Sequence, residues 1–295
     1  MLRANAILLA ALGACASIPP PPPEPPRPRT VVGPVPLPGG PEALVPIDRC
    51  GDSAEGFDEW VTSFRQHLVA RGISSDLVTR ALGNVAYDDR VIELDRAQSK
   101  KKRSFDEFAS SHVTPARVRR GKARLASNAD LLAKITTRFG VAKEIIVAIW
   151  GLETDFGENQ GSTRSLPALA TLAYDCRRAE RFRGELVSAL RVLQRGDLSV
   201  EGMVGAWAGE LGQTQFLPSS YERYGIDFDG DGRIDLVRST EDALASTAHY
   251  LAEHGWRVGE GYGLETHNFT VLAEWNKSEV YRKTIVLYAT KLVGK

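Results

Sequence analysis

A single acidic residue within an apolar stretch is the part of this sequence whose residue types could do chemistry. Residues 145–157 read I-I-V-A-I-W-G-L-E-T-D-F-G. At 3.6 residues per turn, this segment predicts a helix on which Glu153 projects between Ile146 and Trp150. The apolar face beside it is formed by Ile145, Ile149, Leu152 and Phe156.

An acid in this setting is suited to proton transfer. Removal from water disfavours the charged carboxylate, so Glu153 should hold its proton to higher pH. A general acid that protonates a leaving oxygen needs such a proton near neutral pH. Asp155 and Glu144 point toward the polar side of the helix. The alternative is a buried glutamate paired with an arginine for structural reasons, and the segment alone does not decide between the two.

The N-terminus has the pattern of an export signal. A short basic start precedes an apolar run at residues 6–12, which is too short to span a bilayer. The run ends in L-G-A-C, which resembles the bacterial lipobox and predicts lipidation of Cys15. Ala16 follows, which in Gram-negative signals indicates the outer membrane. Ordinary cleavage near Cys15, giving a soluble exported protein, is the alternative.

A proline-rich segment follows at residues 16–46 and has no means of building a core. We expect it to be an extended spacer, with one folded domain at residues 47–295. The predicted location is therefore the periplasm, with a lipid anchor in the outer membrane.

The charge balance gives no reason to expect a nucleic-acid partner. The 37 basic and 37 acidic residues give a net charge of zero, which does not favour nucleic-acid binding. The one basic run, at residues 100–103, is typical of a solvated helix end or loop.

Three cysteines occur in the chain. If Cys15 carries lipid, an oxidising compartment favours one disulfide between Cys50 and Cys176. Two unpaired buried thiols are the alternative.

Periodicity along the chain is mostly helical, which predicts a mainly α fold. We expect one or two helices over residues 118–139 and a catalytic helix that ends at Gly157. Residues 269–272 have a strand-like pattern. The remaining expected helices cover residues 57–68, 76–82, 165–173, 179–193, 240–254 and 278–292.

An acidic loop matches the start of an EF-hand. Asp227, Asp229 and Asp231 occupy positions one, three and five, and the carbonyl of Arg233 would serve position seven. Position twelve departs from the motif because it is an arginine. The closing ligand would have to come from Glu241 or Asp242, but Asp242 also suits a capping pair with Ser239. The loop predicts structural Ca²⁺, and an Asp-rich turn without metal is the alternative.

Residues 205–221 combine glycines, aromatics, hydroxyls and two glutamines, as sugar-binding grooves do. A helix–turn segment packed through its glycines has the same composition. The sequence has no zinc spacing, no nucleophile elbow and no phosphate loop.

Five motifs in order resemble the lytic murein transglycosylase B family. They are I-V-A-I-W-G-L-E-T-D-F-G, A-L-A-T-L-A-Y-D, G-Q-T-Q-F-L-P-S-S-Y, D-G-D-G-R-I-D-L and D-A-L-A-S-T-A-H-Y-L. The resemblance covers residues 50–295 and implies a lysozyme-like helical domain that cleaves the glycan strands of peptidoglycan. It also implies that Glu153 is the catalytic acid.

The resemblance assigns further residues. The positions that match groove residues of the family are Gln215, Tyr250, Asn276 and Tyr281. Arg177 and Arg178 match a basic pair placed near the muropeptide. The positions that match the family's calcium loop are Asp227, Asp229, Asp231, the Arg233 carbonyl and Asp242.

Three departures from the family pattern stand out. Ala206 replaces a serine found in some members, so one hydrogen bond to the sugar must be absent or replaced. Glu210 occupies a position that is usually small and could add a second acid near the site. The stretch between Trp256 and Asn268 is short, which would leave that end of the groove more open.

The chemistry that the resemblance implies needs one acid. Glu153 would protonate the leaving oxygen and then, as a base, activate the muramoyl C6 hydroxyl, which closes a 1,6-anhydro ring. A hydrolytic muramidase would need a second carboxylate, from Glu210 or Asp155, to activate water. A non-catalytic, calcium-stabilised peptidoglycan-binding lipoprotein is the other alternative.

Overall fold

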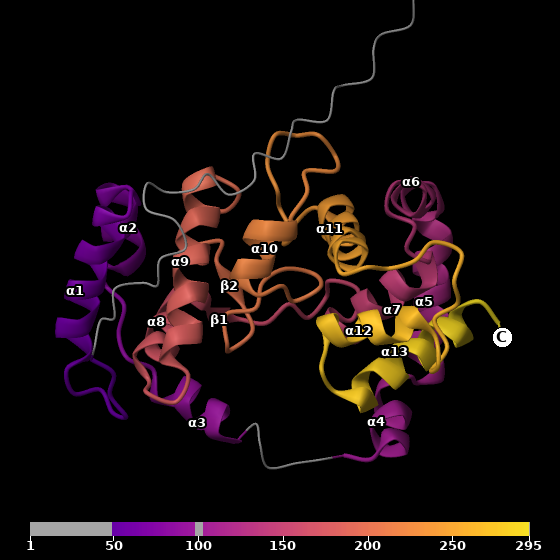
Figure 1. Ribbon diagram of the computed structural model, residues 1–295, viewed down its shortest axis with the longest axis horizontal. Coiled ribbons are helices and arrows are strands. Elements are labelled where there is room, and N and C mark those ends of the chain that lie inside the picture. Colours follow the sequence, from indigo (N-terminus) through magenta and orange to yellow (C-terminus); the bar gives the residue numbers. More distant parts are fainter. Residues whose placement is uncertain (1–48, 98–102, 295) are drawn as a thin grey trace, which may run out of the picture. The chain divides into compact units, whose positions relative to one another are not determined.

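The computed structural model describes residues 49–97 and 103–294, which form 13 α-helices and two short β-strands. The expected mainly α class is confirmed (Figure 1). The predicted signal segment, Cys15, the proline-rich spacer and most of the basic run lie outside the described residues. Within the described ranges, no helix combines the length and the apolar character that a membrane crossing requires.

A first group of helices builds one apolar core. Its members are α1 (Phe57–Ala70), α2 (Ser75–Leu82), α3 (Asp89–Ala97), α8 (Ser165–Tyr174) and α9 (Ala179–Arg195). The 3.6-residue spacing of α1 buries Phe57, Trp60, Phe64 and Leu68 on one stripe, as the sequence predicts. The helices α8 and α9 pack against each other, and α1 and α2 contact α8 (Figure 1).

A second group surrounds the helix that carries Glu153. Its members are α4 (Phe105–His112), α5 (Pro115–Ser127), α6 (Ala129–Phe139), α7 (Lys143–Thr154), α11 (Thr240–Glu253), α12 (His267–Trp275) and α13 (Glu279–Leu292). The central helix α7 contacts α5, α6, α11 and α13. A Cβ at Gly151 would lie 2.9 Å from a ring carbon of Tyr288 on α13, so the absent side chain lets α7 and α13 approach closely.

A middle segment, residues 204–224, joins the two groups of helices. The strand β1 (Thr163–Arg164) pairs antiparallel with β2 (Val204–Gly205), with Thr163 opposite Gly205. The helix α10 (Pro218–Tyr224) then contacts both α9 and α11. The loop between β2 and α10 therefore lies between the two cores.

Two expectations about local structure need correction. The strand-like residues 269–272 lie inside α12, because Thr266 caps that helix by accepting the Phe269 N–H at 3.3 Å. A run of only four residues fits either element, and here the cap decides. The helix α7 ends at Thr154 rather than at Gly157, since Asp155 and Phe156 adopt φ of 56° and 67°. Phe156 is buried, but it is not part of the helical face.

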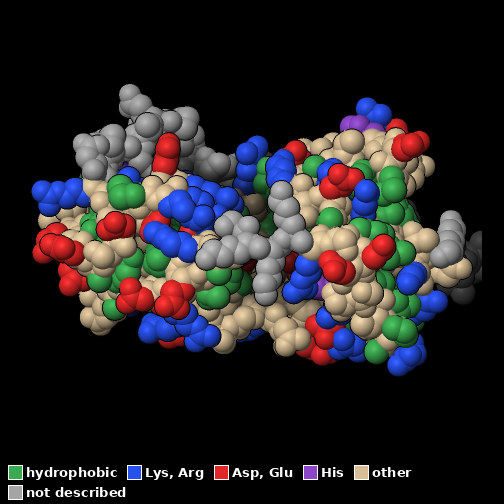
Figure 2. Space-filling model, turned by 90° about the horizontal axis from the view of Figure 1, so that it is seen from below, with side chains coloured by type: hydrophobic (Ala, Val, Ile, Leu, Met, Phe, Trp, Pro, Cys, Tyr) green, Lys and Arg blue, Asp and Glu red, His purple; other side chains and the backbone are tan. Residues whose placement is uncertain are grey.

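Surface charge follows the composition. Basic and acidic side chains are interspersed on the face that Figure 2 shows, in keeping with the net charge of zero.

Candidate active site

Gln213, in the loop between β2 and α10, anchors the end of α7. Trp150 Nε1 donates to Oε1 of Gln213 at 3.1 Å, and Thr154 Oγ1 donates to the Gln213 carbonyl at 2.5 Å. Gln213 is only 5% exposed. These two bonds flank Glu153, so they fix the helical turn that presents its carboxyl group.

Glu153 is partly buried, and two side chains from other helices donate to one of its oxygens. Tyr281 Oη donates to Oε1 at 2.6 Å, and Trp275 Nε1 donates to the same atom at 3.0 Å. Burial raises the pKa of Glu153 to about 7, although both hydrogen bonds act to lower it. The nearby negative charge of Glu210 contributes to this raised pKa. A carboxyl group with such a pKa can give and take a proton near neutrality.

Asp155 has a different environment from Glu153. Arg117 Nε lies 3.1 Å from its Oδ1, and Arg120 Nη2 lies 2.5 Å from the same oxygen. Partial burial acts to raise the pKa of Asp155, but the hydrogen bonds and charges of these two arginines outweigh it and hold the pKa below its usual range. Asp155 is therefore an ion-paired carboxylate that stabilises the end of α7.

Glu210 is the second acid beside Glu153. It lies in the turn between β2 and Leu211, where its carbonyl accepts the Ala206 N–H at 2.9 Å. Burial raises its pKa, while the backbone N–H groups of Glu210 and Ala208 and the charges of Arg181 and Arg178 lower it. Its Oε2 is buried and accepts no hydrogen bond from the described residues. An unsatisfied buried oxygen is costly, so this atom is available to a ligand donor.

Among the four groove residues that the resemblance assigned, Tyr281 alone donates to Glu153. The Tyr250 hydroxyl donates to the Glu274 carbonyl at 2.7 Å, and its ring packs on Trp275. Asn276 follows α12 and accepts the Ser278 N–H at 2.9 Å. Gln215 has φ of 56° and donates to the carbonyls of Gln160 and Gly212.

The predicted basic pair is held by Asp95, an acid for which the sequence predicts no role. Arg177 and Arg178 both form ion pairs with Asp95 on α3, which is 1% exposed. They directly follow Cys176, which is bonded to Cys50. Since the charge of Arg178 acts on Glu210, and that of Glu210 on Glu153, the structure brings the basic pair and both acids into one electrostatic neighbourhood.

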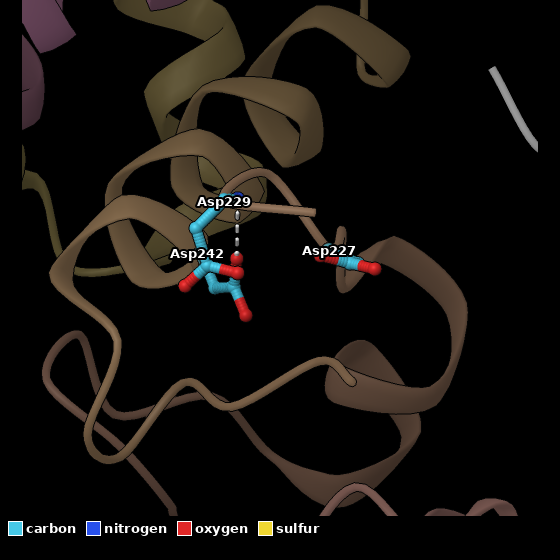
Figure 3. Close-up of side chains that lie close together, drawn as sticks. All are labelled: Asp227, Asp229 and Asp242. Atoms are coloured by element: carbon cyan, nitrogen blue, oxygen red, sulfur yellow. Dashed lines mark hydrogen bonds between the residues drawn. The ribbon is translucent and has the colours of Figure 1, made fainter. Parts of the chain in front are cut away.

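The acidic loop brings three carboxylates together. Ligand atoms of Asp227, Asp229 and Asp242 lie within 4.8 Å of one another (Figure 3). Asp242 also accepts the Phe228 N–H at 2.7 Å and the Asp235 N–H at 2.8 Å. The pKa of Asp242 is raised to about 6, because burial and the charge of Asp229 outweigh the backbone N–H groups that lower it. Hard carboxylate oxygens that repel one another suit a divalent cation.

One predicted ligand, Asp231, stands apart from this group, and the predicted capping residue Ser239 shares Asp242 with it. The exposed Asp231 accepts the Arg233 N–H at 2.8 Å and is not a member of the three-residue set. Ser239 caps α11 by accepting the Asp242 N–H, so the predicted capping pair and the acidic cluster share Asp242.

A sequence model of the transglycosylase SLT domain matches residues 56–267. The chain belongs to this family. Membrane-bound lytic murein transglycosylase B of Escherichia coli is 36% identical over 196 residues, which are 66% of this chain and 53% of that protein. The chain thus aligns with about half the length of this curated relative.

Solved structures of the family superpose well. SltB3 from Pseudomonas aeruginosa, in complex with NAG-anhNAM-pentapeptide, has a TM-score of 0.78 and 33% identity, covering 81% of this chain and 80% of that one. The Escherichia coli lytic transglycosylase SLT35, in complex with calcium, has a TM-score of 0.73 and 26% identity. That match covers 83% of this chain and 96% of the other. The resemblance seen in the sequence motifs is confirmed.

Three further residues of the site are not among those that the sequence predicts. Gln213 lies in the noted G-Q-T-Q motif, but its carbonyl and amide oxygens hold α7 instead of facing outward. Trp275 is 122 residues from Glu153, and Asp95 lies on a highly charged helix, so neither has a local signal. The tryptophan in W-N-K-S-E-V-Y could have been found only from its nearness to the matched Asn276 and Tyr281.

Proposed function

We propose that this protein is a lytic murein transglycosylase that cleaves the β-1,4 bond between N-acetylmuramic acid and N-acetylglucosamine. The observation that best supports this proposal is the environment of Glu153, which is partly buried and has a pKa of about 7. The hydrogen bonds that the described residues donate to it reach only one of its two oxygens. The complex of SltB3 with a NAG-anhNAM-pentapeptide supports the same substrate class.

In the proposed reaction Glu153 acts twice. Its proton passes to the glycosidic oxygen as the bond from that oxygen to muramoyl C1 breaks. The carbonyl of the substrate's own N-acetyl group stabilises the positive charge that develops at C1. The Glu153 carboxylate then takes the proton of the C6 hydroxyl while the C6 oxygen bonds to C1. Glu153 is protonated again, and no water is consumed.

The ion pairs of Asp155 count against a hydrolytic route in which Asp155 activates water. Arg117 and Arg120 neutralise Asp155, which makes it a poor base. Glu210 has a raised pKa and an unsatisfied oxygen, so it is the acid that could activate water in a hydrolase. We assign it instead to a sugar hydroxyl or amide, replacing the hydrogen bond that Ala206 cannot provide.

Mass analysis of products from purified peptidoglycan tests the proposal. Wild-type protein should release 1,6-anhydromuropeptides, whereas Glu153→Gln should release none and still bind the polymer. Glu144→Gln is the matched control, since Glu144 lies on the same helix and its bond from Tyr262 can survive the change. Reducing ends would establish a hydrolase, and no release by the wild type would establish a binder.

We extend the proposal to the acidic loop, which we assign to structural Ca²⁺. Asp227, Asp229 and Asp242 would supply carboxylate oxygens, with Asp231 and the Arg233 carbonyl completing the shell. Support comes from the clustered carboxylates and from the relative SLT35, whose structure is a complex with calcium.

We also propose a periplasmic location with a lipid anchor at Cys15 in the outer membrane. The lipobox-like L-G-A-C supports the anchor, and the named relative is membrane-bound. Cys15→Ala should move the protein to the soluble periplasmic fraction while activity on isolated peptidoglycan persists. An unlipidated, soluble wild type would refute the anchor.

A further inference from the structure

Trp275 donates a hydrogen bond to Glu153, although the sequence assigns it no role in the site. It is the last residue of α12, and its indole Nε1 lies 3.0 Å from Oε1 of Glu153. Tyr281 from α13 donates to that same oxygen at 2.6 Å. No hydrogen bond from the described residues reaches Oε2. The two oxygens of the carboxyl group are therefore inequivalent.

The direction of the Trp275 bond is fixed by chemistry. An indole N–H only donates, so Oε1 must accept. A carboxylate oxygen has two lone-pair sites, and the Trp275 and Tyr281 donors occupy both of those on Oε1. A proton placed on Oε1 would displace one donor. We propose that Trp275 is a positioning residue that, together with Tyr281, leaves Oε2 as the oxygen of Glu153 that carries the transferable proton.

Aromatic packing holds the indole in place. The rings of Phe216 and Tyr250 each lie edge-to-face with Trp275 at 5.3 Å between centroids. The Tyr250 hydroxyl also donates to the carbonyl of Glu274, the residue before Trp275. Tyr250 thus clamps the end of α12, and we assign its influence on Glu153 to this contact with Trp275. Because the indole is already fixed on two sides, it loses little further conformational entropy when it donates to the carboxylate.

The groups that act on Glu153 come from several elements. Trp275 and Tyr281 stabilise its charged form, whereas Glu210 in the loop after β2 opposes that form. Arg117 on α5 acts on Tyr281 and not directly on Glu153. Removing the indole N–H should therefore raise the pKa of Glu153, because a donor to the carboxylate is lost while burial and Glu210 remain.

Nuclear magnetic resonance of the wild-type full chain tests the bond without a variant. The indole N–H signal of Trp275 should shift with pH and inflect near 7, together with the ¹³C carboxyl signal of Glu153. Trp256 is the internal reference, because it is buried in the apolar cluster against which Trp275 packs. No hydrogen bond of its indole is found among the described residues. A Trp275 signal that stays flat through the Glu153 titration would overturn the proposal.

Trp275→Phe tests the consequence, with Trp256→Phe as the matched control. The Glu153 carboxyl titration should move upward by about one pH unit in the first variant and stay in place in the second. An unmoved titration in a folded Trp275→Phe protein would overturn the inference. Neither titration requires turnover, so this result stands apart from the proposed reaction.

A kinetic test of Trp275→Phe rests on the proposed function. In Trp275→Phe the basic limb of the pH–rate profile should shift upward with the titration, and kcat at pH 5 should fall by about tenfold with KM nearly constant. A loss no larger than that of Trp256→Phe, or a loss without the pH shift, would show a merely structural role. If instead Glu153→Gln retained activity, the proposed function would fail while the two titrations still reported on the hydrogen bond.

Discussion

The hydroxyl of Tyr281 donates to Oε1 of Glu153 across 2.6 Å, joining residues that are 128 positions apart in the chain. Burial and the charge of Glu153 raise the pKa of Tyr281, so its hydroxyl keeps its proton and remains a donor at neutral pH. The helix α7 alone offers Glu153 an apolar setting, and the acid acquires its orientation only when α13 packs against it.

The raised pKa of Glu153 predicts a cost in stability. The folded protein holds this proton up to about pH 7, whereas the unfolded chain releases it near the ordinary value of 4.5. The folded state therefore binds more protons between these values, and stability falls as pH rises through them. Glu153→Gln should raise the free energy of unfolding at pH 8 by about 2–3 kcal/mol and have little effect at pH 4.

Urea unfolding at the two pH values measures this difference. Glu144→Gln is the control, because no comparable gain at pH 8 is expected from it. Equal effects of Glu153→Gln at pH 4 and pH 8 would contradict the raised pKa.

Local sequence patterns predicted much of the fold but not the geometry of the carboxyl group. The spacing of apolar residues located α1 and α7, because each helix buries a face that the 3.6-residue period reveals. The helix over residues 267–275 is not predicted, because the four strand-like residues 269–272 are too few to show a distinct period. The deciding cap at Thr266 lies outside them.

The candidate site shows the same division between local and distant information. Glu153 could be singled out from its own segment, since its neighbours along the helix are apolar. Trp275 and Asp95 act on groups that tertiary packing alone brings close. The αL conformation of Asp155 was not apparent because its two arginine partners come from α5, more than 30 residues earlier.

Glu210→Gln should lower the pKa of Glu153, because the change removes a negative charge that disfavours its ionised form. The basic limb of the pH–rate profile should move to lower pH by about half a unit, as measured on isolated peptidoglycan. Glu201→Gln is the matched control, since Glu201 is exposed and precedes the same loop. A basic limb that moves upward or stays fixed would contradict the placement of Glu210 beside Glu153.

Calcium should raise the melting temperature of the full chain, and chelation should lower it, because a ligand that binds only the folded state stabilises it by mass action. Asp229→Asn should abolish this response, since Asp229 belongs to the clustered carboxylates. Asp231→Asn should weaken the response without abolishing it, because Asp231 would complete the shell but lies outside that cluster. A wild-type melting curve that ignores both calcium and chelator would exclude the metal site.

The bond between Cys50 and Cys176 should stabilise the native protein in an oxidising compartment. It joins residues 126 apart and lies where Gly51 N–H donates to the Tyr174 carbonyl and Cys176 N–H donates to the Gly51 carbonyl. Closing so long a loop restricts the unfolded chain, so Cys50→Ser with Cys176→Ser should lower the free energy of unfolding by about 2–5 kcal/mol. Activity at 25 °C should change by less than about twofold, because Asp95 still holds Arg177 and Arg178 in place. Non-reducing peptide mapping should show one linkage in the exported wild type, and two free thiols there would refute the pairing.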